Sequence, residues 1–382
     1  MTSYPDAKSP TLIVATPTAG EEHAARLLNE TEWRGALTCN QYLAREIYME
    51  SVPLAVNGGK RSWILTEEGV VPDARPILSS CETWKKKTLY TQEGSSAVVE
   101  GWVYGIGSVY TDPRYRGRGY ASRMFHLLRK MLQNGVDKDK QGELIKPMGS
   151  VLWSDIGKSF YAKLGWEPHA SAHAAFPASQ KVEGATDLAW GTITYENLET
   201  FVNLDCDLMR QSIAAKTELE QHQFALLPDS DTVRWRLYRD AWIAEQIMPG
   251  KSEEKVHGVW AGVEGNRVWA IWSRAYSDDP LQVEKNTLNI LRLVIEDESA
   301  STEELAASLT VILREAVQAA AKWKLGTVVM NNPTSAVKDA LEKSGISFKI
   351  AERESYSVPS LLVFGKDSKD FDWVGNEMYG WC

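Results

Sequence analysis

The chain has 382 residues, of which 43% are hydrophobic, so it is too long for one small core and predicts two domains. Its formal net charge of −9 argues against general nucleic-acid binding and suits a cationic amine as substrate. The sequence has no apolar run long enough to span a membrane and does not begin like a signal peptide, and its four cysteines are not spaced like metal ligands. We therefore expect a cytoplasmic protein with no metal and no nucleic-acid or membrane partner.

The first half of the chain reads as a mixed α/β domain. Apolar periodicity predicts one strand, two amphipathic helices and an antiparallel meander. In chain order these are strand 11–14, helices 21–29 and 41–48, and strands 62–66, 74–82 and 100–110. Gly105 and Gly107 interrupt the last strand, which indicates a bulge or a close backbone approach, although two incidental glycines in an edge strand would give the same pattern.

A glycine-rich turn follows that strand and leads into the helix of residues 124–130. Gly117 and Gly119 let the backbone approach an anion closely, and the first N–H groups of the helix have no intrahelical partner. Arg114, Arg116 and Arg118 add positive charge at the same place. Neither the P-loop nor the dinucleotide fingerprint fits, so the turn predicts another kind of phosphate loop, with an ordinary strand–turn–helix as the alternative.

A second motif lies about forty residues downstream, where strand 150–154 precedes the segment 157–166, Gly-Lys-Ser-Phe-Tyr-Ala-Lys-Leu-Gly-Trp. Together with Arg116-x-x-Gly119-x-Ala121, it resembles the R/Q-x-x-G-x-G/A loop and the "A..FY.KLGF" helix of the GNAT superfamily of acyl-CoA-dependent N-acetyltransferases. The resemblance implies a GNAT fold, an α/β mixed sheet, with acetyl-CoA as co-substrate. The cofactor-binding residues that it implies are Val109, Tyr110, Thr111, Arg116, Gly117, Arg118, Gly119, Tyr120, Ala121, Ser122 and Ser154.

The second half repeats this order of elements after a stretch of small residues. The expected elements are strands 256–263, 268–273 and 287–295, helix 302–324, strand 326–330 and helix 335–344. The acidic segment 296–299 stands where the arginines should be and would repel pyrophosphate. We therefore expect a catalytic domain at 1–168, a linker at 169–190 and a degenerate GNAT-like domain at 191–382, with an unrelated α/β domain as the alternative.

Four segments narrow the resemblance to the fungal lysine N6-acetyltransferase family: 77–83, 108–121, 152–157 and the aromatic end at Trp381-Cys382. That family transfers acetyl from acetyl-CoA to the ε-amine of free L-lysine, the first step of lysine degradation in certain yeasts. A polyamine, an amino sugar or an amine toxin as acceptor stays open. So does an acyl-CoA-binding regulatory module without turnover, and the oligomeric state is not predicted.

Amide formation requires a deprotonated amine, donors for the oxyanion and a proton for the departing thiolate. The resemblance puts Tyr161 at the position of the superfamily's acid tyrosine, with a buried core tyrosine as the alternative. Backbone N–H groups of residues 109–111 are suited to polarise the thioester carbonyl. Ser154 stands where the superfamily commonly has Asn and Gly157 where it has Ala, which leaves the details of that cofactor contact open.

The acceptor side is less well defined. Glu82 is the first candidate carboxylate for the amine, because a buried glutamate needs a partner. Glu46 and Glu50 are weaker candidates, and exposed helix charge is the preferred account of both. Asp155 is expected to cap the helix that carries Tyr161.

The C-terminal segment 371–382 is rich in aromatic residues, whereas chain ends are normally polar and frayed. In some tandem acetyltransferases, such as the enhanced-intracellular-survival type, the terminal carboxylate acts as base. By that resemblance the α-carboxylate of Cys382 is the candidate general base, and Trp373, Tyr379 and Trp381 would wall the acceptor pocket. Packing of the tail without a catalytic role is the alternative.

Overall fold

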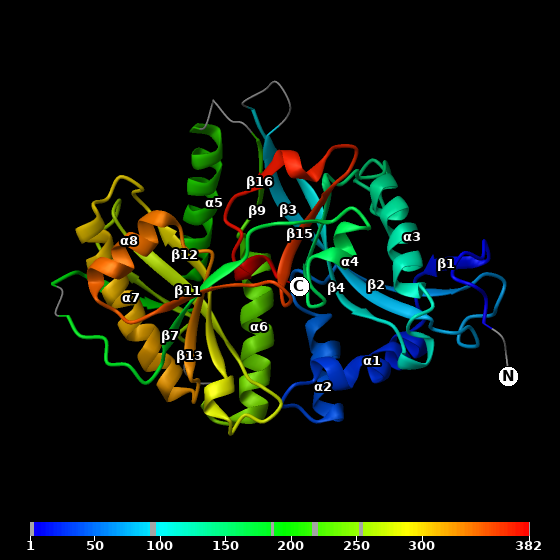
Figure 1. Ribbon diagram of the computed structural model, residues 1–382, viewed down its shortest axis with the longest axis horizontal. Coiled ribbons are helices and arrows are strands. Elements are labelled where there is room, and N and C mark those ends of the chain that lie inside the picture. The colour runs from blue at the N-terminus through cyan, green and yellow to red at the C-terminus, as the bar shows by residue number, and fades with distance from the viewer. Residues whose placement is uncertain (1–3, 92–96, 185–186, 216–220, 252–254, 382) are drawn as a thin grey trace.

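The computed structural model describes the chain except for residues 1–3, 92–96, 185–186, 216–220, 252–254 and 382. The described residues form two mixed sheets, each with helices packed on it, that lie side by side in two lobes (Figure 1). The predicted mixed α/β class is confirmed. Among the described residues, no helix is long and apolar enough to cross a membrane.

The N-terminal half builds most of the first sheet, in the spatial order β1-β2-β3-β4-β5. Neighbouring strands are antiparallel except β4 and β5, which are parallel. The elements are β1 (Leu12–Ala15), α1 (Ala19–Trp33), α2 (Cys39–Met49), β2 (Lys60–Glu67), β3 (Ser79–Thr91), β4 (Val98–Tyr110), α3 (Tyr120–Asn134), β5 (Gly149–Ser154), α4 (Ser159–Ala162) and β6 (Glu167–Pro168). Strand β3 begins and ends later than expected, because its three consecutive lysines hide the alternating pattern of a strand.

The second half repeats the same order around the second sheet. Its elements are β8 (Trp190–Ile193), α5 (Leu198–Ala215), β9 (His222–Leu226), α6 (Ser230–Ile247), β10 (Gly258–Ala261), β11 (Val268–Ala275), β12 (Thr287–Ile295), α7 (Thr302–Lys322), β13 (Thr327–Asn331), α8 (Ser335–Ser344) and β14 (Lys349–Glu352). Here β12 and β13 are the parallel pair. Each unit therefore has one parallel pair within an otherwise antiparallel meander.

The two units exchange a strand. Strand β7 (Ala172–Pro177) follows β6 in the chain but pairs with β13 and β14 in the second sheet. Strand β15 (Val358–Val363) follows β14 but pairs with β5 and β6 in the first sheet. Each strand fills the gap between two strands of the other unit, so each sheet is completed by the other half of the chain.

This exchange changes the expected domain boundaries. The range 169–190, expected to be a linker, contains β7, whose small residues gave no clear strand signal. The range 191–382 is not confined to the second unit, because β15, β9 and β16 (Phe371–Trp373) all join the first sheet. Strand β9 pairs with β3 and β16 pairs with β9.

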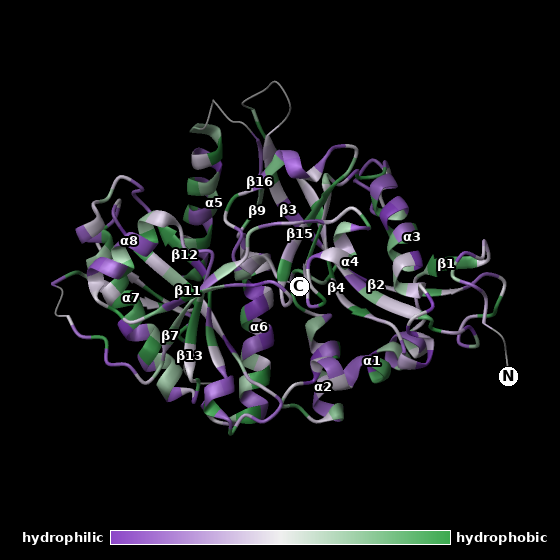
Figure 2. Cartoon of the chain, in the orientation of Figure 1, coloured by the Kyte–Doolittle hydropathy of each residue, from purple (hydrophilic) through white to green (hydrophobic). Residues whose placement is uncertain are grey.

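Each unit has its own core, and a further core joins the units. In the first unit, α3 packs Phe125 and Leu128 against the sheet near the buried Trp166. In the second unit, α7 buries a long apolar face that includes Leu309 and Ile312. A third cluster unites the two sheets with the C-terminal segment. Figure 2 shows hydrophobic and hydrophilic residues in alternating bands along α3 and α5, as helices on the outside of a sheet require.

Candidate functional site

A cavity of about 1500 Å³ is lined by residues of both units. Its walls come from β4 and the turn after it, from α2 and α6, and from the end of β14 with the loop of residues 353–357 that follows it. The structure brings many of the expected site residues together around it. Those that line it are Glu82, Val109, Tyr110, Thr111, Arg116, Gly117, Gly119, Tyr120, Ala121, Ser122, Tyr161 and Trp381.

Strands β4 and β5 separate at this cavity. Their parallel pairing runs from Val103 opposite Gly149 to Ile106 opposite Leu152 and does not extend to the ends of the two strands. On its other side β4 contains a bulge, because Glu82 pairs with Gly107 while Ser80 pairs with Tyr110. The extra residue lies next to Ser108, which has a φ of 51°. Part of the backbone of 107–110 therefore leaves the regular ladder and faces the cavity.

The glycine turn leaves the beginning of α3 open. Gly119 is the N-cap with a φ of 86°, and no side chain caps the helix. A Cβ at Gly119 would meet only Ala7, and one at Gly117, which has a φ of 77°, would meet nothing within 4 Å. The glycines are thus required by backbone conformation, and the space in front of the helix remains available to an anion.

The three arginines of the turn have different surroundings. Arg116 donates from Nε to the carbonyl of Thr111 at 3.0 Å and lies over the ring of Tyr110. Arg114 is paired with Asp112, which also accepts from the Arg114 amide at 2.9 Å and so fixes the turn. Arg118 is exposed and is not among the residues that line the cavity. Arg116 is therefore the arginine that the structure holds at the cavity wall.

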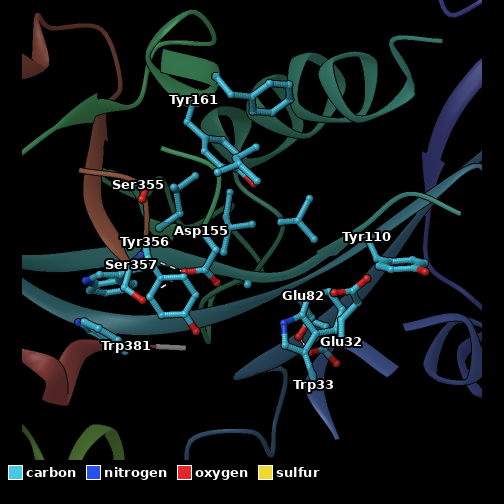
Figure 3. A pocket seen from close by; sticks show the side chains of 18 of the residues that line it. Glu32, Trp33, Glu82, Tyr110, Asp155, Tyr161, Ser355, Tyr356, Ser357 and Trp381 are labelled. Carbon is cyan, nitrogen blue, oxygen red and sulfur yellow. Dashed lines mark hydrogen bonds between the residues drawn. The ribbon is translucent and has the colours of Figure 1, made fainter. Parts of the chain in front are cut away.

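Tyr161 enters the cavity from α4, as Figure 3 shows. Its ring lies between Phe125 and Phe160, with centroid distances of 5.1 and 4.9 Å, and the residue is 7% exposed. Burial raises the pKa of the Tyr161 phenol, and the neighbouring Cys81 and Asp155 act in the same direction. The phenol is therefore protonated at neutral pH and can donate its proton into the cavity.

Ser154 and Asp155 have different contacts from those expected. The Ser154 hydroxyl donates to the carbonyl of Gly157 at 2.6 Å and is buried outside the cavity lining, so it stabilises the turn before α4. Asp155 does not cap α4. It accepts from the backbone N–H and the hydroxyl of Ser357, at 2.9 and 3.1 Å, and lines the cavity (Figure 3). Burial raises the pKa of the Asp155 carboxyl.

The acidic residues of the acceptor side are already paired. Glu82 accepts from the Ser108 hydroxyl at 2.7 Å and forms an ion pair with Lys60. Glu46 is not an exposed helix charge, as its carboxylate is largely buried and bound by Arg45 at 2.6 Å. Glu50 is partly exposed and pairs with Arg26. Glu82 therefore lies at the bulge of β4, where a residue of the acceptor site was expected, but its carboxylate is already paired with the ammonium group of Lys60.

The C-terminal segment reaches the cavity with one of its expected aromatic residues. Trp381 lines the wall, with the Arg353 guanidinium 5.2 Å from its ring centroid. Trp373 and Tyr379 do not line the cavity, contrary to expectation: Trp373 packs on Trp153, and the Tyr379 hydroxyl donates to the carbonyl of Leu226 at 2.7 Å. These two residues belong to the core that supports the tail.

The end of the chain is held by a further contact. The ammonium group of Lys86 donates to the carbonyl of Gly380 at 2.9 Å, in a buried position. Figure 1 shows the chain end between the two lobes. Cys382, the expected source of the base, lies outside the described residues.

Helix α6 contributes site residues that the sequence interpretation missed. Trp235, Arg236 and Arg239 all line the cavity. The positive charge of Arg45, followed by burial, lowers the pKa of Arg239 to about 9. No helix was expected between 191 and 255, so the helical spacing of Trp235 and Arg239 within an apolar segment was the signal that went unused.

The second unit has no comparable anion site in its described residues. Its helix α7 begins with a capping box, in which the Ser301 amide donates to Glu304 at 2.9 Å and the Glu304 amide donates to the Ser301 hydroxyl at 3.3 Å. Glu296 is bound by the Arg267 side chain at 2.8 Å. The helix start is satisfied by its own side chains and surrounded by acidic residues, which agrees with the expected degenerate copy.

Residues 173–382 match the family described as the LYC1 GNAT-like C-terminal domain. The chain is 23% identical over 321 residues to an uncharacterized protein of Saccharomyces cerevisiae, covering 76% of each. It is 24% identical over 404 residues to a protein of Yarrowia lipolytica named lysine acetyltransferase, covering 94% of this chain and 96% of that protein.

Among solved structures, the fold resembles a probable N-acyltransferase of unknown function from Enterococcus faecalis. The TM-score is 0.52 at 13% identity, over 92% of this chain and 72% of that one. At this identity the likeness concerns the fold.

Proposed function

The chain belongs to the family of the LYC1 GNAT-like C-terminal domain, and from this premise we propose that it is an acetyl-CoA-dependent N-acetyltransferase acting on a small amine, the ε-amine of free L-lysine. The repeated order of elements around two sheets supports a tandem arrangement, with the second unit as a degenerate copy. One observation carries the proposal: the open N-terminus of α3 and Tyr161 line the same cavity, at the place where the strands β4 and β5 separate.

Acetyl-CoA fits this arrangement in two respects. The uncapped amides at the beginning of α3 suit its pyrophosphate, and Gly117 and Gly119 add no side chain in front of them. The gap between β4 and β5 suits an extended pantetheine arm, whose amides would use backbone groups that the sheet leaves unpaired. Backbone N–H groups near the bulge of β4 would then polarise the thioester carbonyl.

The chemistry follows from the side chains around the bulge. The neutral amine of the acceptor attacks the thioester carbon, a C–N bond forms, and the carbonyl oxygen becomes an oxyanion held by backbone N–H groups. When the C–S bond breaks, the thiolate takes the proton of Tyr161, which burial keeps on the phenol at neutral pH. The amine proton passes to a carboxylate, for which we propose the α-carboxylate of Cys382.

Asp155 is a second candidate base because of a specific observation. It lies at the cavity beside Tyr161, and its raised pKa brings it closer to the operating pH of a general base. Its hydrogen bonds to Ser357 use one carboxylate oxygen and leave the other uncommitted.

The name of the Yarrowia lipolytica relative supports lysine as the acceptor, and thiol release with acetyl-CoA tests it. L-Lysine, L-ornithine, polyamines and amino sugars should be compared at saturating acetyl-CoA. We expect the highest kcat/KM for L-lysine. A higher value for another amine would reassign the acceptor, and no turnover despite tight CoA binding would favour a regulatory acyl-CoA-binding module.

A further inference from the structure

Arg239 on α6 is a cation without a partner in the cavity. Its side chain lines the cavity and is partly exposed to it, and it makes no ion pair or hydrogen bond with the described residues. The other basic residues nearby differ: Arg45 binds Glu46, and Lys60 binds Glu82. A guanidinium without a counter-charge in a cavity wall is costly, so its retention there points to a ligand that supplies the missing negative charge.

The surroundings of Arg239 favour an anion. Positive charge from Arg45 and Arg236 repels its guanidinium, while Glu46, whose carboxylate acts on it in the opposite sense, is already bound by Arg45. This local excess of positive charge would be relieved by an anionic group of the ligand. The planar guanidinium has the geometry to bind a carboxylate with two parallel hydrogen bonds.

Helix α6 fixes Arg239 between the two units. Trp235, one turn earlier, packs edge-on against Trp84 of β3 at 5.5 Å. Asp240, the next residue, is bound by Arg274 of β11 at 2.9 Å. Gln246 further along accepts from Gln41 of α2 at 3.2 Å. The guanidinium is thus held by a rigid element anchored to both sheets, as a recognition residue requires.

We propose that Arg239 binds a carboxylate of the acceptor, so that the substrate is a free amino acid with a side-chain amine. This inference rests on the proposed acetyltransferase function. The phosphates of CoA have their own site at the beginning of α3, whereas Arg239 faces the cavity from α6 beside α2. A lysine within a protein has no α-carboxylate and would leave Arg239 unpaired, as would a polyamine.

Two probes that lack the carboxylate test this directly. L-Lysinamide replaces it by a neutral amide, and cadaverine lacks the carboxylate but keeps both amines of lysine. The variants are Arg239→Gln, the charge-conserving Arg239→Lys and, as matched control, Arg234→Gln. Arg234 lies on the same helix but outside the cavity lining, where it contacts Ser230 and Glu199.

We expect wild-type kcat/KM to be about 30-fold or more higher for L-lysine than for L-lysinamide, the scale of truncating one partner of a buried charge pair. Arg239→Gln should remove this preference through KM, without changing the values for L-lysinamide and cadaverine. Arg239→Lys should be intermediate, and Arg234→Gln should behave as wild type. Equal values for L-lysine and L-lysinamide in the wild type would overturn the proposal, even if Arg239→Gln failed to fold.

Calorimetry separates failure of this inference from failure of the proposed function. Saturable binding of L-lysine to the CoA-bound wild type, lost with L-lysinamide and in Arg239→Gln, would support the carboxylate site even without turnover. Turnover of amines with no effect of Arg239→Gln on the L-lysine preference would leave the acetyltransferase in place and refute the carboxylate site. If neither L-lysine nor L-ornithine bound at all, the carboxylate site would be refuted on binding alone.

Discussion

Helices α3 and α7 follow equivalent strands of the two units but begin in opposite ways. Helix α3 starts at a glycine in the left-handed region with no side-chain cap, whereas α7 starts with the reciprocal hydrogen bonds of Ser301 and Glu304. The turn before α3 carries arginines, and the one before α7 carries acidic residues. The same backbone arrangement therefore leaves the first amides of the helix without a side-chain cap in one unit and caps them in the other.

This difference indicates what each unit contributes. A side-chain cap stabilises a helix by about 0.5–2 kcal/mol, and α3 forgoes that stabilisation. Its free amides are useful only if a ligand binds them, while the satisfied start of α7 serves the fold alone. We infer that the second unit acts by completing the cavity, through the 353–357 loop and α6.

The largest expected effect comes from breaking the open helix start. Gly119→Val should abolish CoA binding while the protein still folds, because a β-branched side chain opposes the left-handed backbone and displaces the amides from the pyrophosphate. Calorimetry with CoA on the folded variant measures this effect.

The matched control is Gly345→Val in the second unit, at the end of α8 with a φ of 69° and nothing within 4 Å of the added Cβ. It should lose stability to a similar degree and bind CoA normally. Equal CoA affinity in the two variants would show that the beginning of α3 is not the anion site.

Removal of the Tyr161 hydroxyl should come next in size. Tyr161→Phe is expected to lower kcat by roughly 10²–10⁴-fold, the contribution of a general acid, while CoA affinity and the melting temperature stay near wild type. Single-turnover measurements isolate the chemical step. Normal turnover in that regime would make Tyr161 a core residue between Phe125 and Phe160 and nothing more.

The two candidate bases can be separated by an added residue. A glycine after Cys382 moves the terminal carboxylate without deleting the contacts of Trp381, and it should lower kcat by about 10²-fold if that carboxylate is the base. Asp155→Asn should lower kcat instead if Asp155 is the base.

The pH profile gives the direction of the effect. A base must be ionised to work, so activity is lost as the pH falls through its pKa, and the raised pKa of Asp155 would place this limb above the usual range for an aspartate. If neither change alters kcat or its acidic limb, a different group takes the amine proton.

The smallest effect should come from the closed helix start. Ser301→Ala removes the cap of α7 and should destabilise the protein by about 1 kcal/mol, measured by denaturant unfolding, without changing CoA affinity. A measurable change in CoA binding would show that the second unit takes part in anion recognition, contrary to the comparison.

The local sequence was sufficient to predict the glycine turn and Tyr161 as parts of the candidate site. Gly117, Gly119 and Tyr161 stand at fixed offsets from their strands, so a motif places them without knowledge of the rest of the fold. Arg239 could not be placed in this way, because its role depends on α6 lying between two sheets. Trp373 and Tyr379 were assigned to the pocket for their aromatic character, but a core and a pocket wall share that composition.

The exchanged strands could not be predicted either. Strand β15 is buried throughout and mostly apolar, as a strand covered on both faces is, and nothing in its six residues specifies which sheet receives it. Pairing partners are set by the gaps that each sheet leaves, which are tertiary features. The interpretation of β7 failed for a related reason, since Ala174 is fully buried but alanine is a weak strand former.

The strand exchange also determines how the protein unfolds. Neither unit can unfold without withdrawing an interior strand from the sheet of the other. The two units should therefore unfold in a single cooperative transition and not independently. A proteolytic or engineered fragment that ends before β15 would leave the edges of β5 and β6 unpaired. One that ends before β13 would also leave β7 without either of its partner strands. Unpaired strand edges favour domain swapping and aggregation. A homodimer of single units that exchange their last strands would have the same strand pairing. When two such units are joined in one chain, one of them can lose its catalytic residues and still supply the strand that completes the sheet of the other.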